Sequence, residues 1–504
     1  MTWPELHDVL REHDLTRADT PGGASGTVTG IAYDSRAIKP GEVFVALRGQ
    51  HADGTAFARQ AVDRGAAAIV SEAPVPEGIS VPWAIVTDAR LALAVLADAF
   101  FQHPSGEMQV VGITGTNGKT TTAYLLASIF DAAGIRCGLL GTVGYRIGPG
   151  DNEVREAART TPEAPHLQAL LREMVEQGSR AAVLEVSSHA LALRRVDGMT
   201  FAAGVFTNLT RDHLDFHSDM EAYFQAKRRL FEMLPRDAPS LLNVDDPRGL
   251  ALVEVGGRPV TYAINRAADL TPGPLSFSLA GLSFEVRTPR GTLQIRSALV
   301  GRPNVYNILA AVATATALGL SFDAIERGVR NLGGVPGRFE VVSSAKDEVT
   351  VVVDYAHTDD ALRNLLETAR PLASGRLITV FGCGGDRDRP KRPLMGAVAG
   401  RYSDVIVITS DNPRSEDPNR IIEEIQRGIT ADTRRDSAQR ALAIVDRRSA
   451  IATAIEIARP GDLVLIAGKG HEKYQVIGDR TLPFDDAAVA REALARRQTN
   501  SGVT

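Results

Sequence analysis

Short apolar runs, each followed by a glycine-rich turn or a polar cluster, recur along the 504 residues of the chain and are separated by helical stretches. The runs span residues 110–114, 181–185, 349–354, 377–381, 405–409 and 463–467. Fully apolar strands that alternate with helices are typical of parallel sheets covered on both faces. Such sheets bind ligands at the carboxyl ends of their strands. The sequence therefore predicts an α/β fold whose chemistry lies in the loops after these strands.

The chain is too long for a single hydrophobic core, and two breaks divide it. Its 504 residues correspond to about three domains of roughly 100–200 residues each. Proline and glycine interrupt any helix within 103–107 and again within 331–337. Alternating residues from 275 to 295 predict an antiparallel patch inside the second domain. We expect the three domains to span 1–105, 106–336 and 337–504.

Charge and cysteine content exclude several classes of protein. The chain has 56 Lys and Arg against 61 Asp and Glu, a formal net charge of −5, so no global positive field attracts nucleic acid or an anionic membrane. Two cysteines, Cys137 and Cys383, build neither a disulfide framework nor a cysteine-rich zinc site. The N-terminus lacks a basic, apolar secretory signal, and the uncharged run 305–322 suits a buried helix. We expect a cytoplasmic protein with no membrane partner.

The strongest local pattern is the segment 112–122, Gly-Ile-Thr-Gly-Thr-Asn-Gly-Lys-Thr-Thr-Thr, between a buried strand and a helix expected to start at Ala123. Glycines let backbone N–H groups close on phosphate oxygens, Lys119 supplies a cation, and Thr120 can offer its hydroxyl to Mg²⁺. Ile113 stands where the strict G-x-x-x-x-G-K-[ST] pattern has its first glycine, so the loop is a variant. An ordinary glycine-rich turn is the alternative.

Further polar clusters follow the other strands. Glu185 ends a buried strand and is the kind of hard oxygen ligand that Mg²⁺ prefers. The segment 207–217 holds two histidines and two aspartates, but no cysteine or HExxH helix supports zinc there, so magnesium is preferred. Structural roles remain open for Asp212, Asp215 and His217. Taken alone, Lys227 reads as a solvated cation on a helix.

The phosphate segment, Gly-Thr-Asn-Gly-Lys-Thr-Thr at 115–121, resembles the ATP loop of the Mur ligase family. Other matches occur in the same order along the chain, from Asp34 to Glu472. They are Asp-Ser-Arg at 34–36, Gln-His-Ala-Asp-Gly at 50–54, Glu-Val-Ser-Ser-His at 185–189, Gly-x-x-Asn-x-x-Asn at 301–307, Gly-Arg-Phe-Glu at 337–340, Asp-Tyr-Ala-His at 354–357, Gly-Gly-Asp-Arg-Asp at 384–388, Asp-Asn-Pro-Arg at 411–414 and Gly-Lys-Gly-His-Glu at 468–472. On these motifs the chain is identified as a member of that family.

The resemblance implies three domains: a small N-terminal α/β domain that binds UDP-MurNAc, a central P-loop ATPase domain with a parallel sheet, and a C-terminal Rossmann-like domain that binds the amino acid. It implies ATP, two Mg²⁺ ions and a CO₂-derived carbamate on Lys227. The implied catalytic residues are Lys119, Glu185, His213, Lys227 and Arg338, and the implied metal ligands are Thr120, Glu185, His213 and Lys227. The implied ATP-binding residues are Gly115, Thr116, Asn117, Gly118, Lys119, Thr120, Thr121, Asn304, Arg338 and His357.

The resemblance also implies the substrates. Residues expected at the UDP-MurNAc-dipeptide are Tyr33, Ser35, Gln50, His51, Ala52, Thr160, Thr161, Ser187 and Arg195; Arg159 and Leu193 depart from the Asn and Gln of some members. Residues expected at the incoming amino acid are Arg387, Asp411, Asn412, Pro413, Arg414, Gly468 and Glu472. Asp-Asn-Pro-Arg resembles the signature of members that add meso-diaminopimelate. That substrate has one more carboxylate than lysine, and an arginine fork can hold it bidentately.

The implied reaction is ATP-dependent ligation of meso-2,6-diaminopimelate to the D-Glu γ-carboxylate of UDP-MurNAc-L-Ala-D-Glu through an acyl phosphate, in peptidoglycan precursor synthesis. We expect a monomer that acts on small molecules. Four alternatives stay open: a lysine-adding Mur ligase, a folylpolyglutamate- or cyanophycin-type ligase, a non-catalytic binding module, and a nucleotide-dependent switch or nucleic-acid motor. The acidic charge balance argues against the last of these.

Overall fold

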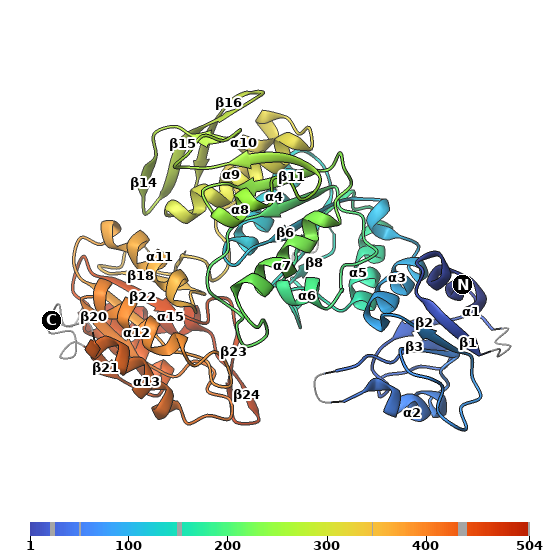
Figure 1. Ribbon diagram of the computed structural model, residues 1–504. Helices are drawn as coiled ribbons and strands as arrows, with labels where there is room; N and C mark the ends of the chain where they lie inside the picture. The colour runs from blue at the N-terminus through green and yellow to red at the C-terminus, as the bar shows by residue number, and fades with distance from the viewer. Residues whose placement is uncertain (21–25, 50–51, 149–153, 345, 432–440, 502–504) are drawn as a thin grey trace.

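The computed structural model describes residues 1–504 except 21–25, 50–51, 149–153, 345, 432–440 and 502–504. Figure 1 shows α/β bodies in chain order, with the central body between the N-terminal and C-terminal ones. Within the described ranges, no helix combines the length and apolar character needed to span a membrane.

The N-terminal body is built on a five-stranded sheet in the order β1-β5-β4-β3-β2. In this sheet β1 and β5 pair antiparallel, whereas β5–β4, β4–β3 and β3–β2 pair parallel. Asp88 caps α3 by accepting a hydrogen bond from the Leu91 amide, which satisfies one free donor at the helix start. The elements are α1 (Trp3–Glu12), β1 (Thr16–Thr20), β2 (Gly30–Ala32), β3 (Glu42–Val45), η1 (Gly54–Phe57), α2 (Ala58–Asp63), β4 (Ala68–Ser71), β5 (Trp83–Val86), α3 (Ala89–Phe100) and η2 (Pro104–Gly106).

The central body has a seven-stranded sheet in the order β12-β11-β10-β6-β9-β7-β8, parallel apart from the β7–β8 pair. Strands β10 and β9 flank β6, so the carboxyl ends of these three strands meet at one edge of the sheet. The elements are β6 (Gln109–Thr114), α4 (Lys119–Ala132), β7 (Cys137–Leu140), β8 (Tyr145–Arg146), α5 (Ala164–Glu176), β9 (Ala181–Glu185), α6 (Ser188–Ala192), β10 (Ala203–Phe206), α7 (Met220–Glu232), β11 (Pro239–Asn243), α8 (Pro247–Ala251) and β12 (Arg258–Tyr262).

A separate antiparallel sheet follows, which confirms the patch expected from 275 to 295. Strand β15 pairs with β13, β14 and β16. The elements of this part are β13 (Thr271–Pro272), β14 (Ser276–Ser278), β15 (Gly281–Thr288), β16 (Gly291–Ser297), α9 (Arg302–Ala317) and α10 (Phe322–Asn331).

The C-terminal body is a six-stranded sheet in the order β17-β18-β22-β19-β20-β21, parallel except for the β17–β18 pair, with a hairpin of β23 and β24 beside it. The elements are β17 (Glu340–Val341), β18 (Thr350–Asp354), α11 (Asp359–Ala369), η3 (Arg370–Leu372), β19 (Leu377–Phe381), α12 (Lys391–Tyr402), β20 (Val405–Ile408), α13 (Pro418–Ala431), β21 (Ala441–Ala443), α14 (Arg447–Glu456), β22 (Leu463–Ala467), β23 (Tyr474–Ile477), β24 (Arg480–Pro483) and α15 (Asp486–Ser501).

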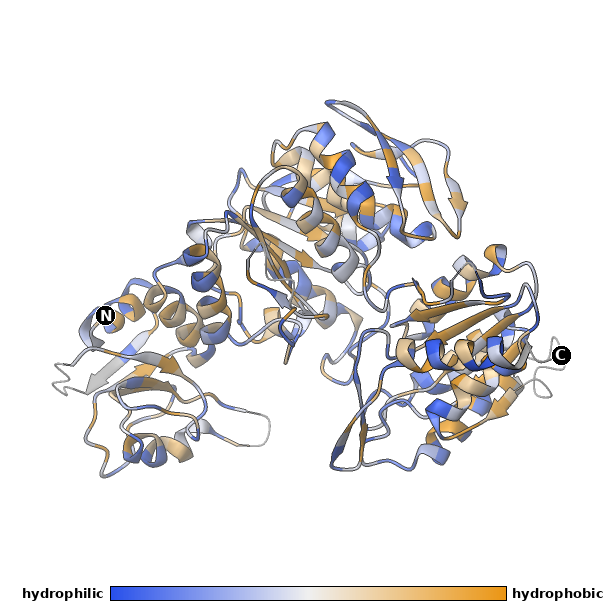
Figure 2. Cartoon of the chain, turned by 180° about the vertical axis from the view of Figure 1, so that it is seen from behind, coloured by the Kyte–Doolittle hydropathy of each residue, from blue (hydrophilic) through white to orange (hydrophobic). Residues whose placement is uncertain are grey.

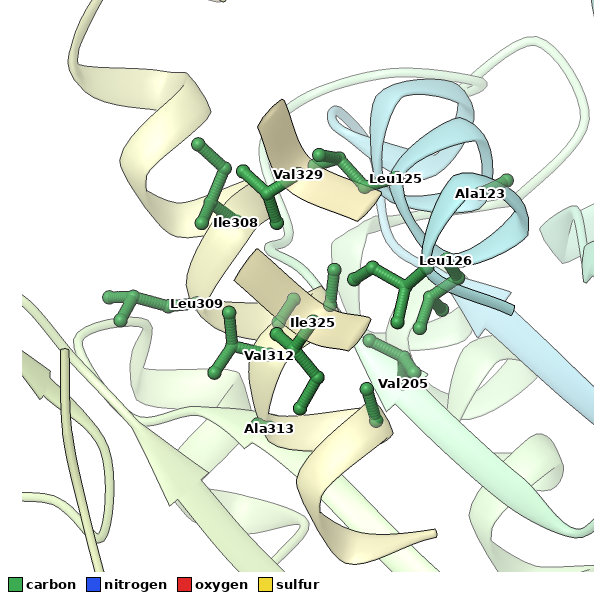
Figure 3. Close-up of a cluster of buried hydrophobic side chains, with 14 of the residues drawn as sticks. Ala123, Leu125, Leu126, Val205, Ile308, Leu309, Val312, Ala313, Ile325 and Val329 are labelled. Atoms are coloured by element: carbon green, nitrogen blue, oxygen red, sulfur yellow. The ribbon is translucent and has the colours of Figure 1, made fainter. Parts of the chain in front are cut away.

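The largest core joins the central sheet to α4, α9 and α10, where Leu126, Ile308 and Ile325 pack together (Figure 3). Gly328 of α10 lets the two helices approach closely, because a Cβ there would lie 2.4 Å from the Cα of Ile129 in α4. In Figure 2 the strands inside each body are mostly apolar, whereas polar residues lie on the outer helices. Burial of this apolar surface is the main stabilising term, at about 25 cal/mol per Å².

The start of α4 differs from the expectation. The helix begins at Lys119, not at Ala123, with Gly118 at its N-cap in a left-handed conformation of φ 88°. Three consecutive threonines have weak helix propensity, so local preference alone does not favour a helix start before Ala123. Because Thr120, Thr121 and Thr122 are buried against the sheet, tertiary packing overrides that preference. Lys119 and Thr120 therefore occupy the first turn, where the helix N-terminus favours anions.

Candidate active site

The phosphate loop follows β6 and is fitted closely against the segment after β10. A Cβ at Gly115, which has φ 145°, would lie 1.9 Å from the Thr207 hydroxyl oxygen, and one at Gly118 would lie 2.3 Å from Oδ1 of Asn307. Thr207 donates a 2.6 Å hydrogen bond to the carbonyl of Asn117. These contacts require glycine at both positions and fix the path of the loop.

Two lysines, the half-buried Lys119 and the buried Lys227, bind the carbonyls of this loop. Lys119 donates from Nζ to the carbonyls of Gly115 (2.9 Å) and Thr116 (2.8 Å), and Lys227 donates to the same Gly115 carbonyl at 2.8 Å. Lys227 is only 1% exposed, so the solvated-cation reading of this residue is wrong. Its ammonium lies 4.4 Å from the centre of the Tyr223 ring.

Burial, with the nearby charge of Lys119 as a second cause, holds the pKa of Lys227 well below its usual range. Arg228 and Arg229, the next two residues of α7, pair with Glu232 and Asp197. The structure thus places a desolvated amine beside the phosphate loop.

Glu185, at the end of β9, faces the same loop and is 1% exposed. Its Oε2 accepts hydrogen bonds from the hydroxyls of Thr120 and Thr142, both at 3.0 Å, and its Oε1 accepts from the Thr142 amide at 2.8 Å. Both carboxylate oxygens are therefore oriented, as expected of a buried charge. Thr142 follows β7 and belongs to no motif found in the sequence.

The segment after β10 brings His213 near the two lysines. His213 has a left-handed φ of 55°, and its Nε2 lies 3.4 Å from Oδ2 of Asp212. Burial lowers the pKa of His213, and the charge of Asp212 opposes that shift. His217 instead contacts the Ser188 hydroxyl at 3.0 Å, which supports the structural role left open for it.

The C-terminal body reaches the phosphate loop through two hydrogen bonds. Arg338 donates from a terminal guanidinium nitrogen to the Thr120 hydroxyl at 3.3 Å, and Asn117 donates to Asp360 at 3.3 Å. The Arg338 guanidinium lies 4.6 Å from the centre of the Tyr355 ring, and its Nε is buried without a hydrogen-bond partner. A buried, unpartnered guanidinium N–H beside a phosphate loop suits an anionic ligand.

The remaining two residues expected at ATP make local contacts. Asn304, in the first turn of α9, donates to the carbonyl of Val300 at 2.7 Å and accepts from Asn307 at 2.9 Å. His357 follows β18, and its Nδ1 lies 2.9 Å from the Tyr355 carbonyl. Asn304 therefore lies beside Asn307, which approaches Gly118, and His357 lies beside Tyr355, which contacts Arg338.

Four residues expected at the sugar-peptide substrate are linked to Glu185. The Thr160 hydroxyl lies 3.1 Å from that of Thr142. The Thr161 hydroxyl donates to the carbonyl of Glu185 at 2.8 Å and accepts from the Ser187 amide at 3.1 Å. Arg195 donates to the carbonyl of Thr161 at 3.0 Å. The structure thus brings these four residues together beside the buried carboxylate.

The departures Arg159 and Leu193 lie in this area. Arg159 pairs with Glu163 at 2.8 Å, and Glu163 also binds Arg195 at 2.8 Å. Arg159 therefore joins an ionic network with a residue expected at the substrate, whereas Leu193 ends α6 as its C-cap.

Of the residues expected at the uridine nucleotide, Gln50 and His51 lie outside the described residues. Tyr33 is 40% exposed, and burial raises its pKa, with the charge of Glu163 in the central body as a further cause. Ser35 donates to Gln60 at 2.7 Å, and Ala52 is exposed. Tyr33 is therefore close enough to the central body to be affected by the charge of Glu163.

The loop after β20 carries the expected diamino-acid residues. Asn412 donates to Oε2 of Glu472 at 3.0 Å. Lys469 donates to Oδ1 of Asn412 at 3.0 Å and to the same oxygen of Glu472 at 2.9 Å. A Cβ on Gly468 would lie 2.6 Å from Oδ2 of Asp411, so the two loops touch. The structure brings these residues together.

Arg387 and Arg414 lie on adjacent loops. Arg414, with φ 52°, donates to the carbonyl of Gly385 at 2.7 Å, and Pro413 before it is buried. Arg387 is exposed. Asp388, next to Arg387, pairs at 3.2 Å with Arg211 of the central body. The two arginines therefore lie on the side of the C-terminal body that meets the segment after β10.

Three side chains at this site were missed by sequence reasoning: Thr142, Asp360 and Lys469. Lys469 stands inside the recognised Gly-Lys-Gly-His-Glu segment at 468–472 and is fully buried. Thr142 and Asp360 carry no local signal, because the fold alone brings them to Glu185 and Asn117.

Comparisons with known families agree with this arrangement. Residues 27–101 match the catalytic domain of the Mur ligase family, residues 113–315 match the Mur ligase middle domain, and residues 337–470 match the Mur ligase glutamate ligase domain. The chain belongs to the Mur ligase family, whose members are amide-forming ligases.

Within the family, the chain is similar to proteins named UDP-N-acetylmuramoyl-L-alanyl-D-glutamate--2,6-diaminopimelate ligase. The one from Geobacter metallireducens is 48% identical and covers 97% of this chain and 100% of the relative. The one from Geobacillus thermodenitrificans is 45% identical over 94% of this chain and 96% of the relative. A solved structure of the same name has a TM-score of 0.69 at 34% identity and covers 99% of both chains.

More distant solved structures share the fold. The MurF ligase of Thermotoga maritima in complex with ADP has a TM-score of 0.61 at 20% identity, over 93% of this chain and 98% of that chain. The folylpolyglutamate synthase of Mycobacterium tuberculosis, complexed with ADP and AMPPCP, has a TM-score of 0.61 at 17% identity and covers 81% of this chain and 95% of that chain.

Proposed function

We propose that this chain ligates meso-2,6-diaminopimelate to the D-Glu γ-carboxylate of UDP-MurNAc-L-Ala-D-Glu, with cleavage of ATP. The observation that carries the proposal is the position of Arg387 and Arg414 on two adjacent loops of the C-terminal body. Asp388, next to Arg387, pairs with Arg211 of the central body. Arg211 lies on the same segment as His213, so these loops meet the candidate active site. The names of the relatives support the same substrates. In this proposal the domains are 1–105 for the uridine nucleotide, 106–336 for ATP and 337–504 for the diamino acid.

The residues present suit a magnesium nucleotide. Glu185 and the Thr120 hydroxyl are 3.0 Å apart and offer hard oxygen atoms at the N-terminus of α4. The described residues contain no cluster of three or more His, Cys, Asp or Glu side chains able to hold a metal, so phosphate oxygens and water would complete the coordination. When bound, Mg²⁺ neutralises phosphate charge and orients the transferred group.

Lys227 suits modification by CO₂. Carbamylation joins a neutral amine to CO₂ and releases one proton, so a lysine with a lowered pKa reacts more readily. The buried Nζ of Lys227, at 2.8 Å from the Gly115 carbonyl, supports this proposal. The product would be an anion beside Lys119, and with Glu185 and His213 it would form a second cation site.

In the proposed reaction, a γ-carboxylate oxygen attacks the terminal phosphorus of ATP and ADP leaves, which gives an acyl phosphate. Lys119 and Arg338 would stabilise the charge on the transferred phosphate, since fixed positive groups carry most of such catalysis. Thr160, Thr161, Ser187 and Arg195 would hold the acyl substrate beside Glu185. The amine of diaminopimelate then attacks the acyl carbon, and phosphate leaves with the carboxylate oxygen.

Two alternatives make different predictions. The substrate of a lysine-adding ligase has no second carboxylate for Arg414, so the free part of this guanidinium would gain no partner when that substrate binds. A folylpolyglutamate-type ligase has no use for a uridine nucleotide. Phosphate release by the purified protein with ATP, the nucleotide dipeptide and each amino acid tests the proposal. Release that depends on diaminopimelate supports it; release that depends on lysine or on folate, and not on diaminopimelate, would refute it.

A further inference from the structure

The two loops that carry Arg387 and Arg414 are joined directly. The Gly385 amide donates to the carbonyl of Asn412 at 2.9 Å, and the Ser415 amide and hydroxyl donate to the two carboxylate oxygens of Asp386 at 3.1 and 2.8 Å. A Cβ on Gly385 would lie 1.9 Å from the carbonyl oxygen of Pro413. The loops therefore pack backbone against backbone.

An ion pair whose arginine is fully buried lies behind this junction. Arg392, in the first turn of α12, is 0% exposed, and its two terminal nitrogens bind both carboxylate oxygens of Glu416 at 2.9 and 3.0 Å. Arg392 also donates to the Gly384 carbonyl at 3.2 Å and to Glu424 at 2.8 Å. One fully buried guanidinium thus contacts the loop of Arg387 through Gly384 and the loop of Arg414 through Glu416.

Glu416 completes the connection from the other loop. Its Oε1 accepts a 2.6 Å hydrogen bond from the Asp386 amide, in addition to the bonds from Arg392. Asp386 and Arg414 both have left-handed backbone, with φ 52° each, which non-glycine residues adopt only when their surroundings hold them there. The pair of Arg392 and Glu416 supplies such surroundings.

We infer that Arg392 and Glu416 are positioning residues that fix the spacing between Arg387 and Arg414 and so select an amino acid with two separated carboxylates. This inference rests on the proposed function, because it assumes that these arginines receive the diamino acid. Neither Arg392 nor Glu416 needs to touch the substrate. Bidentate recognition depends on geometry, and a displacement of about 1 Å can lower a rate about 100-fold.

The test compares Glu416→Gln with a matched control, Asp462→Asn. Asp462 accepts two hydrogen bonds from Arg376, at 2.7 and 2.9 Å, and is 3% exposed. Like Glu416, it is a carboxylate with little exposure that pairs with an arginine of the same body. It precedes β22, whereas Gly468 follows that strand, so the control lies at the opposite edge of the sheet. The steady-state KM and kcat for diaminopimelate, ATP and the nucleotide dipeptide are measured for both variants.

The inference predicts that Glu416→Gln raises the KM for diaminopimelate about tenfold or more, with the KM of the other two substrates and kcat changed less than about threefold. Asp462→Asn lowers the melting temperature and leaves the KM for diaminopimelate unchanged. Equal KM changes in both variants, or an unchanged KM in Glu416→Gln, would overturn the inference.

If Glu416→Gln does not fold, Ser415→Ala takes its place as the test variant. This substitution removes the hydrogen bond from the exposed Ser415 hydroxyl to Asp386, and the KM for diaminopimelate should rise about threefold. Glu416→Asp keeps the charge and is expected to recover part of the affinity. Wild-type protein without diaminopimelate-dependent turnover would overturn the proposed function together with this inference. Normal wild-type turnover with no KM effect in any of these variants would overturn the inference alone.

Discussion

Replacement of Arg414 by alanine tests how this chain selects its amino acid. Arg414 already donates one N–H group to the Gly385 carbonyl at 2.7 Å, and its left-handed backbone is held by a hydrogen bond from its amide to the Val476 carbonyl at 3.1 Å. The rest of the guanidinium fork can bind a carboxylate. The substitution therefore removes the fork and leaves the substrate carboxylate without its partner.

The size of the effect follows from the hydrogen bonds lost. A hydrogen bond to a charged group contributes ~1.5–3 kcal/mol, so a two-bond fork contributes ~3–6 kcal/mol. Because Arg414 is partly exposed and one N–H group is already used, we take the lower end, ~3 kcal/mol. At ~1.4 kcal/mol for each factor of ten, kcat/KM for diaminopimelate falls about 100-fold.

The assay is phosphate release at saturating ATP and nucleotide dipeptide, with diaminopimelate or lysine varied. Arg414→Ala should reduce the preference for diaminopimelate over lysine by a similar factor, because lysine lacks the second carboxylate that the fork would bind. Arg401→Ala, at an exposed position of α12 away from these loops, is the control and should leave the preference unchanged. A loss in Arg414→Ala below about threefold, or an equal loss for both amino acids, would refute the reasoning.

Three further perturbations test other parts of the account. Glu185→Gln should lower kcat/KM at least about 100-fold and raise the Mg²⁺ concentration needed for half-maximal rate; an unchanged Mg²⁺ dependence would argue against its metal role. Asp486→Asn leaves the fully buried Arg447 without its ion-pair partner at 2.6 Å. Denaturant unfolding should show the C-terminal body destabilised by ~3–5 kcal/mol. An unshifted unfolding midpoint would contradict this prediction. Hydrogen bonds from Arg392 lower the pKa of Glu416 from 4.5 to about 2, so its stabilising effect is complete above pH 4.5 and is lost as the pH falls toward 2. The Glu416→Gln variant should lack this pH-dependent loss of stability when it is unfolded by acid. Identical acid-unfolding profiles of the wild type and the variant would disprove the prediction.

The fold could be predicted from the sequence because its strands are fully apolar and end in recognisable loops. Residues 181–185 and 463–467 form buried parallel strands, as expected, and the polar clusters lie at their carboxyl ends. The start of α4 could not be predicted, because Thr120 and its neighbours are held in the helix by tertiary burial that no local pattern reveals.

Some residues of the candidate site could be predicted from the sequence and others could not, because the contacts of the latter form only in the folded chain. Lys227 had a signal in its spacing: it shares one face of α7 with Tyr223, Leu230 and Phe231, all of them buried. Thr142 had none, because its two contacts with Glu185 arise only when β7 and β9 pair. Motifs identify the residues whose chemistry is distinctive, whereas residues that orient them are found only when the chain is folded.

The central claim is that an acyl phosphate forms where the phosphate loop, Glu185 and the C-terminal body meet. It is tested most directly with UDP-MurNAc-L-Ala-D-Glu labelled with ¹⁸O in the γ-carboxylate. After turnover with ATP and diaminopimelate, mass spectrometry of the released phosphate should find one ¹⁸O atom per product formed, because the carboxylate oxygen leaves with phosphorus. Unlabelled phosphate, with amide product formed at the normal rate, would contradict the account.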